Sequence, residues 1–543
     1  MGYRTKKLDH LGIVAGICER IQLVEQIDSF FPEKDRKVSV GLAVKAMILN
    51  ALGFSSRPLY LSSEFFENKP VETLLGQGLE ASDLNDDSLG RALDALFQAD
   101  VTTVFAKVAS HTFRWMGIPH TFVHLDSTTL SLHGQYYEQL QRHPDEPVPI
   151  HLTKGYSKDQ HPELKQLVCS MICAYKTSIP LWMEALDGNA SDKTSFPKTI
   201  EAYLQQVNPA QTPCFIVDSA FYTEENLREL EAFSVSWLTR VPETITKVKE
   251  YLYQTKQEQF SPTSLEGYSI FETHEEYAGI QQRWLIISSE KAFEREKKTL
   301  EKRREKEQKN IEKALKALEK KRFLCQEDAT KRIEEEAKGW SFTKVKSICF
   351  EKVEHHKGKG RPKKGAEPTK VSWKLKIETE ANEEAVKREE RKLGRFVLGT
   401  NLAKGSFSSE EALESYKAQG SSIERGFRFL KDPMFFSSGL YLQKPSRIMA
   451  LVMVMCLSLL VYSFAEHELR TALRKNNDVV PDQKGKPTQQ ITMRRVFQMF
   501  EGIDVLWIET GGPIQKLVLN MNEIHQRIVS YLGKEVRKCY LLE

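Results

Sequence analysis

Cysteine is scarce in this sequence and widely scattered, with eight residues in a chain of 543. Only Cys169 and Cys173 lie close together, and their spacing does not match the ligand pattern of a zinc site. Several of the thiols fall inside apolar runs, where free buried cysteines are common. We therefore expect reduced thiols, a cytoplasmic protein and no structural zinc.

The signatures of two large enzyme classes are also missing. The chain has no Gly-rich phosphate loop of the Walker kind, so no ATP is expected, and it has no serine nucleophile elbow. The net charge at pH 7 is only +4, so an argument for nucleic-acid binding depends on local basic patches. These absences leave the acidic side chains as the main candidates for chemistry.

Long hydrophobic runs are nearly absent. Residues 448–465 form the one run apolar enough to suggest a membrane span, but it contains Ser458, Tyr462 and Ser463 and is short for a bilayer. A fully buried core helix explains it better, and we expect no membrane association. The first residues run directly into a polar and apolar pattern, so no signal peptide is expected.

The pattern of apolar residues predicts a mixed α/β protein in five parts. Its centre is an RNase H-like mixed sheet, interrupted by an α+β insertion and flanked by helical N-terminal and C-terminal regions. The expected parts are 1–118 (helical), 119–241 (first part of the sheet), 242–394 (insertion), 395–440 (second part of the core) and 441–543 (helical).

Two apolar segments in the predicted sheet each lead to a single aspartate. Residues 122–126 end in Asp126, and residues 214–218 end in Asp218. The order strand, strand, strand, helix, strand, helix, strand is that of an RNase H-like sheet, in which the first and fourth strands are neighbours. The sequence therefore predicts that Asp126 and Asp218 lie side by side.

A third acid lies in a short helix predicted between Ser422, which can cap it, and Pro433, which stops it. One face of this helix carries an acid and two cations at spacings of four and three residues: Glu424, Arg428 and Lys431. Three carboxylates suffice to hold two Mg²⁺ ions roughly 4 Å apart, the arrangement that cleaves phosphodiesters. By itself, such a helix is equally typical of a surface with ordinary ion pairs.

Other polar side chains compete for the same role. Asp187 and Asp192 belong to a predicted turn, where aspartate is common for backbone reasons, while Asp159 lies in a loop and Glu184 on a strand. His124 and His133 flank the first aspartate without any zinc-ligand spacing, so we interpret both as structural or substrate-contacting residues.

The insertion has two highly charged segments. Residues 290–338 have only a thin apolar stripe among charged side chains, which is typical of a long solvated helix. Residues 357–365 contain Gly-Arg-Pro flanked by lysines and glycines, which is similar to an AT-hook core. Arg361 would then enter a narrow minor groove, although a flexible basic loop that binds phosphate explains the segment as well.

Four motifs together carry a resemblance to a known family. They are Leu-Asp-Ser-Thr-Thr at 125–129, Gly-Tyr-Ser-Lys-Asp at 155–159, Val-Asp-Ser-Ala at 217–220 and Ile-Glu-Arg-Gly-Phe-Arg-Phe-Leu-Lys at 423–431. The chain resembles the DDE transposases of bacterial insertion sequences, in particular the group with a large insertion before the catalytic glutamate. The family's arginine four places before the glutamate is Gly420 here, and Tyr416 is one place out of step with the family's tyrosine.

This resemblance implies a DNA transposase that cuts the ends of its element and transfers the freed strands into target DNA. It implies a catalytic, metal-binding triad of Asp126, Asp218 and Glu424 with two Mg²⁺ (or Mn²⁺) ions, and double-stranded DNA and a second subunit as partners. We assign DNA contacts to Lys431, Arg428, Tyr416, Arg361 and Lys158. The alternative is a catalytically inactive or recruited DNA-binding protein derived from such an element.

Overall fold

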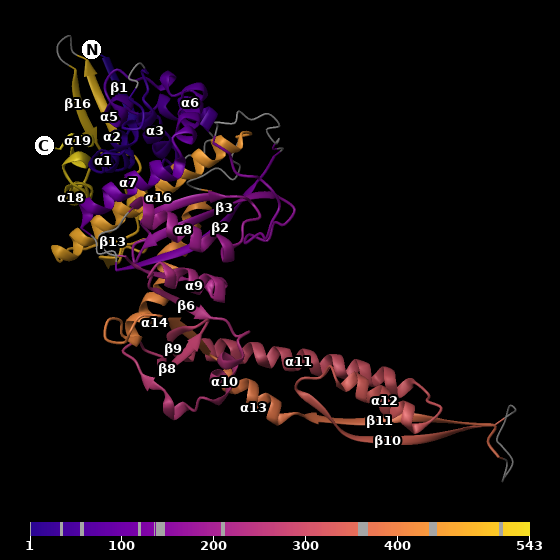
Figure 1. Ribbon diagram of the computed structural model, residues 1–543. Helices are drawn as coiled ribbons and strands as arrows, with labels where there is room; N and C mark the ends of the chain where they lie inside the picture. The colour runs from indigo at the N-terminus through magenta and orange to yellow at the C-terminus, as the bar shows by residue number, and fades with distance from the viewer. Residues whose placement is uncertain are drawn as a thin grey trace.

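The computed structural model describes residues 2–32, 36–54, 59–117, 121–134, 136, 147–207, 212–356, 367–433, 442–509 and 514–542. A large sheet lies between a helical body, which contains both termini, and a long arm that extends away from it (Figure 1).

The centre of the sheet consists of five strands whose residues are almost all buried. They are β2 (Phe122–Leu132), β3 (Lys165–Ala174), β4 (Pro180–Leu186), β5 (Cys214–Val217) and β6 (Trp237–Val241). Their spatial order is β4-β3-β2-β5-β6, with antiparallel pairing from β4 to β2 and parallel pairing from β2 to β6. This is the RNase H-like order, and it confirms that the first and fourth strands are neighbours.

Four more strands extend the sheet beyond β6. In spatial order they are β12 (Arg395–Thr400), β9 (Ile280–Ser289), β8 (Tyr268–Tyr277) and β7 (Ser261–Pro262), so the sheet has nine strands. β12 pairs antiparallel with both β6 and β9. Part of the segment 242–394 is therefore built into the central sheet.

The rest of that segment forms the arm seen at the lower right of Figure 1. It consists of α11 (Glu290–Lys320), α12 (Gln326–Ala337), the ribbon of β10 (Thr343–His355) and β11 (Lys370–Ala381), and α13 (Glu383–Lys392). The thin apolar stripe of α11 packs on α12 and the ribbon in a small core of its own, which explains how so charged a helix is held. Arg361 and the basic segment around it lie outside the described residues.

Helices cover both faces of the RNase H-like part. Alternate residues of β3 point to opposite faces, so Ile172 packs toward α8 (Asp192–Val207) and Met171 toward α16 (Pro445–Lys475). α7 (Val101–Met116) packs directly against β4 and contacts both α8 and α16.

Helix α16 is the only helix, among the residues that the structure describes, long and apolar enough to cross a membrane. Protein surrounds it: 89% of its apolar window is buried between the sheet and the N-terminal helices. Residues 448–465 thus form a buried core helix, as their sequence predicts.

The two ends of the chain build one helical body around the end of α16. From the N-terminal side come α1 (Leu11–Arg20), α2 (Leu23–Asp28), α3 (Val40–Leu52), α4 (Ser62–Glu67), α5 (Val71–Leu75) and α6 (Asp86–Gln98), and from the C-terminal side α17 (Met493–Met499), α18 (Glu523–Leu532) and α19 (Lys534–Cys539). The remaining helices are α9 (Glu224–Ala232), α10 (Thr246–Gln254), α14 (Ser409–Lys417) and α15 (Ile423–Leu430), and a small ribbon joins β13 (Val480–Pro481) to β14 (Pro487–Thr488).

The terminal regions also contain a three-stranded sheet, which the sequence analysis did not expect. β1 (Gly2–Lys7) pairs with β15 (Asp504–Glu509), which in turn pairs with β16 (Gln515–Leu519). Within the region 441–543, which the sequence predicts to be helical, residues 515–519 are strand and α18 begins only at Glu523. β1 and β16 are short and largely exposed, so their pairing with β15 rather than their own pattern defines them.

Candidate active site

Asp126 lies in the middle of β2, where the neighbouring strand β5 ends. Parallel register pairs Phe122 with Cys214 and His124 with Ile216, so two residues further on Asp126 is level with Asp218, just past the end of β5. The apolar run ends at Asp126, but the strand itself continues to Leu132 along β3. The early end of β5 therefore opens the space in front of the Asp126 carboxylate.

Both aspartates are partly covered and held by backbone groups. The Ser127 amide donates a hydrogen bond to Asp126 Oδ1 (2.7 Å), and burial raises the pKa of Asp126 to about 6. The Ala220 amide donates to Asp218 Oδ1 (2.8 Å), and burial also raises the pKa of Asp218. Their carboxylates are thus oriented before any ligand binds.

A third carboxylate, that of Asp192, lies beside these two. Ligand oxygens of Asp126, Asp192 and Asp218 all lie within 4.8 Å of one another. In the sequence, turn chemistry already explains Asp192, so the residue was not assigned to the site. Strand order contained the missing signal: β4 runs parallel to β2 and β5, so the residues that follow β4 return to the same edge of the sheet.

The ammonium group of Lys158 sits among these three acids. Its Nζ lies 3.6 Å from Asp126 Oδ1 and 3.2 Å from Asp192 Oδ2, and it donates to the Ser127 carbonyl (2.7 Å). Burial alone would lower the pKa of Lys158, but the neighbouring carboxylates outweigh it and the pKa is raised. Lys158 was predicted to contact DNA, but in this structure its charge faces the acids.

Glu424 is the first-turn acid of α15, which packs on β2 and β3. Its side chain is exposed and is not part of the three-aspartate cluster. Tyr416 links the two regions: burial raises the pKa of its phenol, and Asp218 and Glu424 both add to that rise. The phenol is therefore within electrostatic reach of both carboxylates.

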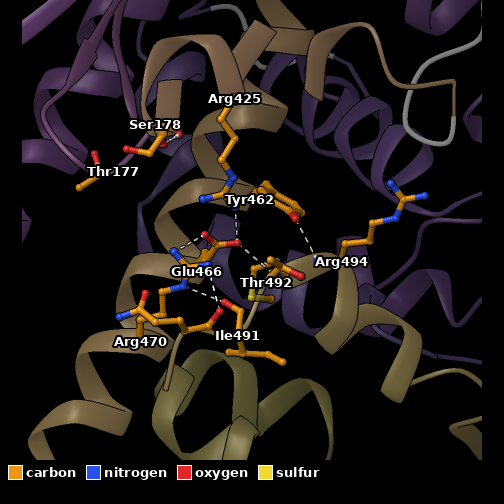
Figure 2. A network of polar contacts seen from close by, with 12 residues as sticks. Thr177, Ser178, Arg425, Tyr462, Glu466, Arg470, Ile491, Thr492 and Arg494 are labelled. Atoms are coloured by element: carbon orange, nitrogen blue, oxygen red, sulfur yellow. Dashed lines mark hydrogen bonds and ion pairs between the residues drawn. The ribbon is translucent and has the colours of Figure 1, made fainter. Parts of the chain in front are cut away.

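Helix α15 is fixed from two sides (Figure 2). At its start, Ser422 Oγ accepts a hydrogen bond from the Lys176 amide (3.1 Å), and Ser178 Oγ donates to the Ser421 carbonyl (3.0 Å). On its inner face, Arg425 forms an ion pair with Glu466 of α16 (2.5 Å). Two elements therefore fix the position of Glu424: the turn between β3 and β4, and the buried helix α16.

Arg428 in the last turn of α15 and Lys431 just past its end differ in their surroundings. Lys431 Nζ forms an ion pair with Asp159 Oδ1 (2.6 Å), on the loop that also carries Lys158. Arg428 is exposed and donates to the Gly420 carbonyl (3.2 Å). Arg428 is therefore open to a ligand, whereas Lys431 has an internal partner.

Neither histidine near Asp126 belongs to the cluster. His124 is fully buried, neither of its ring nitrogens has a hydrogen-bond partner, and burial lowers its pKa to about 4. His133 is exposed. His124 is thus a neutral core residue, in line with the structural alternative.

Close packing joins the loop that carries Lys158 to the turn that precedes Asp192. The buried Gln166 side chain donates to the carbonyls of Tyr156 (3.2 Å) and Gly188 (2.7 Å). A Cβ atom on Gly188 would lie 2.1 Å from the Gln166 carbonyl oxygen and 2.5 Å from that of Thr153. Only glycine fits between these backbones.

We expect Gly188→Ala to destabilise the protein by about 1–3 kcal/mol or more and to weaken divalent-metal binding, because the turn must move away from β3. Thermal unfolding and Mn²⁺ titration of the purified variant measure both effects. Gly405→Ala is the matched control, since nothing lies within 4 Å of its added Cβ. Equal behaviour of the two variants would contradict the packing argument.

The cluster has the donor chemistry of a site for a hard divalent cation. Its ligand atoms are carboxylate oxygens, which Mg²⁺ and Mn²⁺ prefer, and a positively charged group already lies among them. One ammonium offsets only one of three negative charges. The residues present therefore fit a divalent metal.

Comparisons with known proteins agree with this geometry. Residues 118–461, well over half of the chain, match the family model described as a transposase DDE domain. Residues 3–110 match a domain of unknown function (DUF4277). A comparison with curated proteins finds no significant match.

Among solved structures, the chain is similar to a piggyBac transposase in a synaptic complex with hairpin DNA. The likeness covers 92% of this chain and 82% of that one at 9% identity, with a TM-score of 0.37, which is too low to compare the two structures in detail. The family match does not depend on it. The chain belongs to the family of transposases with a DDE domain.

Proposed function

We propose that this transposase cleaves DNA at the ends of an insertion sequence by a two-metal DDE mechanism and joins the freed ends to target DNA. In the first step water attacks the scissile phosphorus and the bond to the 3′ oxygen breaks. The 3′-hydroxyl so released then attacks a phosphodiester of the target. The approach of Asp126 and Asp218 at one edge of the sheet supports this proposal most directly.

Asp126, Asp218 and Glu424 would hold the two Mg²⁺ or Mn²⁺ ions. When bound, such ions activate the attacking oxygen and stabilise the leaving oxygen. The pKa of Asp126, about 6, lies below neutral pH, so most of this carboxyl group is ionised and ready to bind a cation at pH 7. Glu424 joins the aspartates if α15 or its side chain moves toward Asp218.

Positive charges on α15 would guide DNA to the site. Arg428 is exposed, and Lys431 lies one residue past the helix end, within reach of the loop at 154–163. Tyr416, whose phenol is affected by the charges of both Asp218 and Glu424, is a further candidate for contact with DNA near the cleaved bond. Arg361, which lies outside the described residues, remains a candidate from its sequence.

Replacing Lys431 by glutamine is expected to weaken DNA binding and to reduce the salt dependence, d log K/d log[salt], by about one unit. Asp159→Asn should act in the opposite direction, because it frees Lys431 from its internal partner. Fluorescence anisotropy over a range of salt concentrations measures both, with Lys484→Gln in an exposed turn as the control. Weaker binding by Asp159→Asn would contradict this role for Lys431.

We further propose that the element is a bacterial insertion sequence of the group with an insertion before the glutamate. The long arm, which follows β9 and returns to β12, is consistent with that group. The enzyme would act in the cytoplasm as a homodimer that pairs two DNA ends, without ATP.

The test is a nicking assay with purified protein and DNA from the repeats that flank its gene. We expect strand cleavage with Mg²⁺ or Mn²⁺ and none with excess EDTA, whereas DNA binding persists in both. Ligation of the cut 3′ ends to added plasmid would detect the transfer step. Binding without a nick under any divalent ion would instead indicate an inactive, recruited DNA-binding protein.

A further inference from the structure

We propose that Asp192 is a ligand in the divalent-metal site of this transposase. This inference rests on the proposed function and extends it, because the triad expected from the family motifs does not include Asp192. It concerns a specific residue at the start of α8, the helix that follows the third strand of the RNase H-like sheet.

Position is the first observation that supports it. Asp192 has an oxygen within 4.8 Å of ligand oxygens of both Asp126 and Asp218, whereas Glu424 is outside that group. Residues from three different elements thus meet at one point: β2, the end of β5 and the start of α8. An aspartate needed only to begin a helix would not have to face two other carboxylates.

The hydrogen bonds of Asp192 are the second observation. Its Oδ1 accepts from the Ser127 hydroxyl (2.5 Å), and its Oδ2 lies 3.2 Å from Lys158 Nζ. The side chain is therefore turned inward and fixed beside Asp126, the residue before Ser127. Such support orients a carboxylate before a cation arrives and lowers the cost of binding it.

The charge of Lys158 is the third observation, since its ammonium group is a cation already present among these oxygens. It contacts Asp192 and Asp126 together and also bonds to the Ser127 hydroxyl (3.0 Å). Three carboxylates around one ammonium leave uncompensated negative charge in a partly buried space, which is costly unless a further cation binds. The ammonium thus shows that positive charge is accommodated beside Asp126 and Asp192, where a divalent cation would also bind.

Lys158 also distinguishes a ligand from a merely structural residue. If Asp192 only anchored Lys158, the loss of Asp192 would change the stability of the protein but would not change its affinity for metal. If both interact with the same cation position, Lys158 competes with the metal. Removing Lys158 should then tighten metal binding, and removing Asp192 should weaken it.

The experiment is a titration of the full-length protein with Mn²⁺, in which electron paramagnetic resonance measures the free ion. We expect Asp192→Asn to weaken Mn²⁺ binding by at least about tenfold, Asp192→Glu to recover part of the loss, and Lys158→Gln to strengthen binding. Asp86→Asn is the matched control, since Asp86 is also the first residue of a helix but is exposed. Circular dichroism checks that each variant folds. If Asp192→Asn does not fold, the Mn²⁺ affinities of Asp192→Glu and Lys158→Gln test the inference instead.

The Asp126→Asn variant distinguishes a failure of the role of Asp192 from a failure of the proposed function. If it abolishes Mn²⁺ binding while Asp192→Asn binds like the wild type, the role of Asp192 is refuted and the proposed function stands. If Mn²⁺ binding is absent from the wild type or insensitive to Asp126→Asn, both are refuted. Weaker binding by Lys158→Gln would also contradict the inference.

Discussion

Asp126→Asn is expected to reduce metal-dependent cleavage of end DNA by at least about 10³-fold, while DNA affinity changes by less than about twofold. Asparagine keeps the shape of the side chain and the hydrogen bond from Ser127, but removes the charge that faces the metal site. Metal ions contribute several kcal/mol to stabilising the transition state of such reactions, and each 1.4 kcal/mol corresponds to about a factor of ten in rate. Single-turnover cleavage of labelled end DNA at saturating protein measures the loss.

Asp218→Asn should have an effect of the same size, because its carboxylate faces the same point. Asp328→Asn, an exposed first-turn acid of α12 on the arm, is the control and should cleave normally. Cleavage by Asp126→Asn at more than about a tenth of the wild-type rate would remove that residue from the reaction.

Glu424→Gln is the most informative member of this series. The family motif predicts a loss as large as that of Asp126→Asn, but the structure leaves Glu424 outside the aspartate cluster. A large loss of cleavage with unchanged Mn²⁺ binding by the free protein would mean that Glu424 enters the site only with DNA bound. Normal cleavage would mean that Asp192 supplies the third carboxylate in its place.

The central sheet could be predicted because its strands are buried on both faces and are therefore largely apolar. Five such strands in the observed order have a known arrangement, and this alone brings Asp126 and Asp218 together. The pairing of strands that lie far apart in the sequence could not be predicted in the same way. β1 and β15 are some 500 residues apart in the sequence, and nothing in either short strand specifies the other.

Asp192 was missed because its local sequence already had a sufficient explanation. Aspartate near glycine and asparagine is typical of turns. Asp187, five residues earlier, does have such a structural role, because it ties the turn to the segment before β3 by accepting a hydrogen bond from the His151 amide (2.7 Å). Asp192 differs from Asp187 only because the chain returns, at Asp192, to the edge of the sheet where β2 and β5 carry their aspartates. An acid that follows a strand parallel to the one carrying the catalytic aspartate is therefore a better candidate than its local sequence indicates.

The second large effect is expected for Glu466→Gln, in the network shown in Figure 2. Glu466 is only 3% exposed and accepts from Arg425 (2.5 Å), Arg470 (2.8 Å) and the Met493 amide (3.1 Å). Glutamine has nearly the same shape but leaves two guanidinium groups without their countercharge. Breaking a buried ion pair in this way costs about 3–5 kcal/mol, so the protein should unfold at a clearly lower temperature.

This network also connects stability to the active site, because Arg425 is the neighbour of Glu424 in α15. Glu466→Gln should therefore reduce cleavage even below its unfolding temperature, while the aspartate cluster, which lies on other elements, still binds Mn²⁺. Glu380→Gln, which breaks the exposed pair with Lys344 on the arm, is the control and should cost less than about 1 kcal/mol. Calorimetry, Mn²⁺ titration and single-turnover cleavage on both variants distinguish the outcomes. If Glu466→Gln is no less stable than Glu380→Gln and cleaves at the wild-type rate, the buried ion pair does not position the helix that carries Glu424.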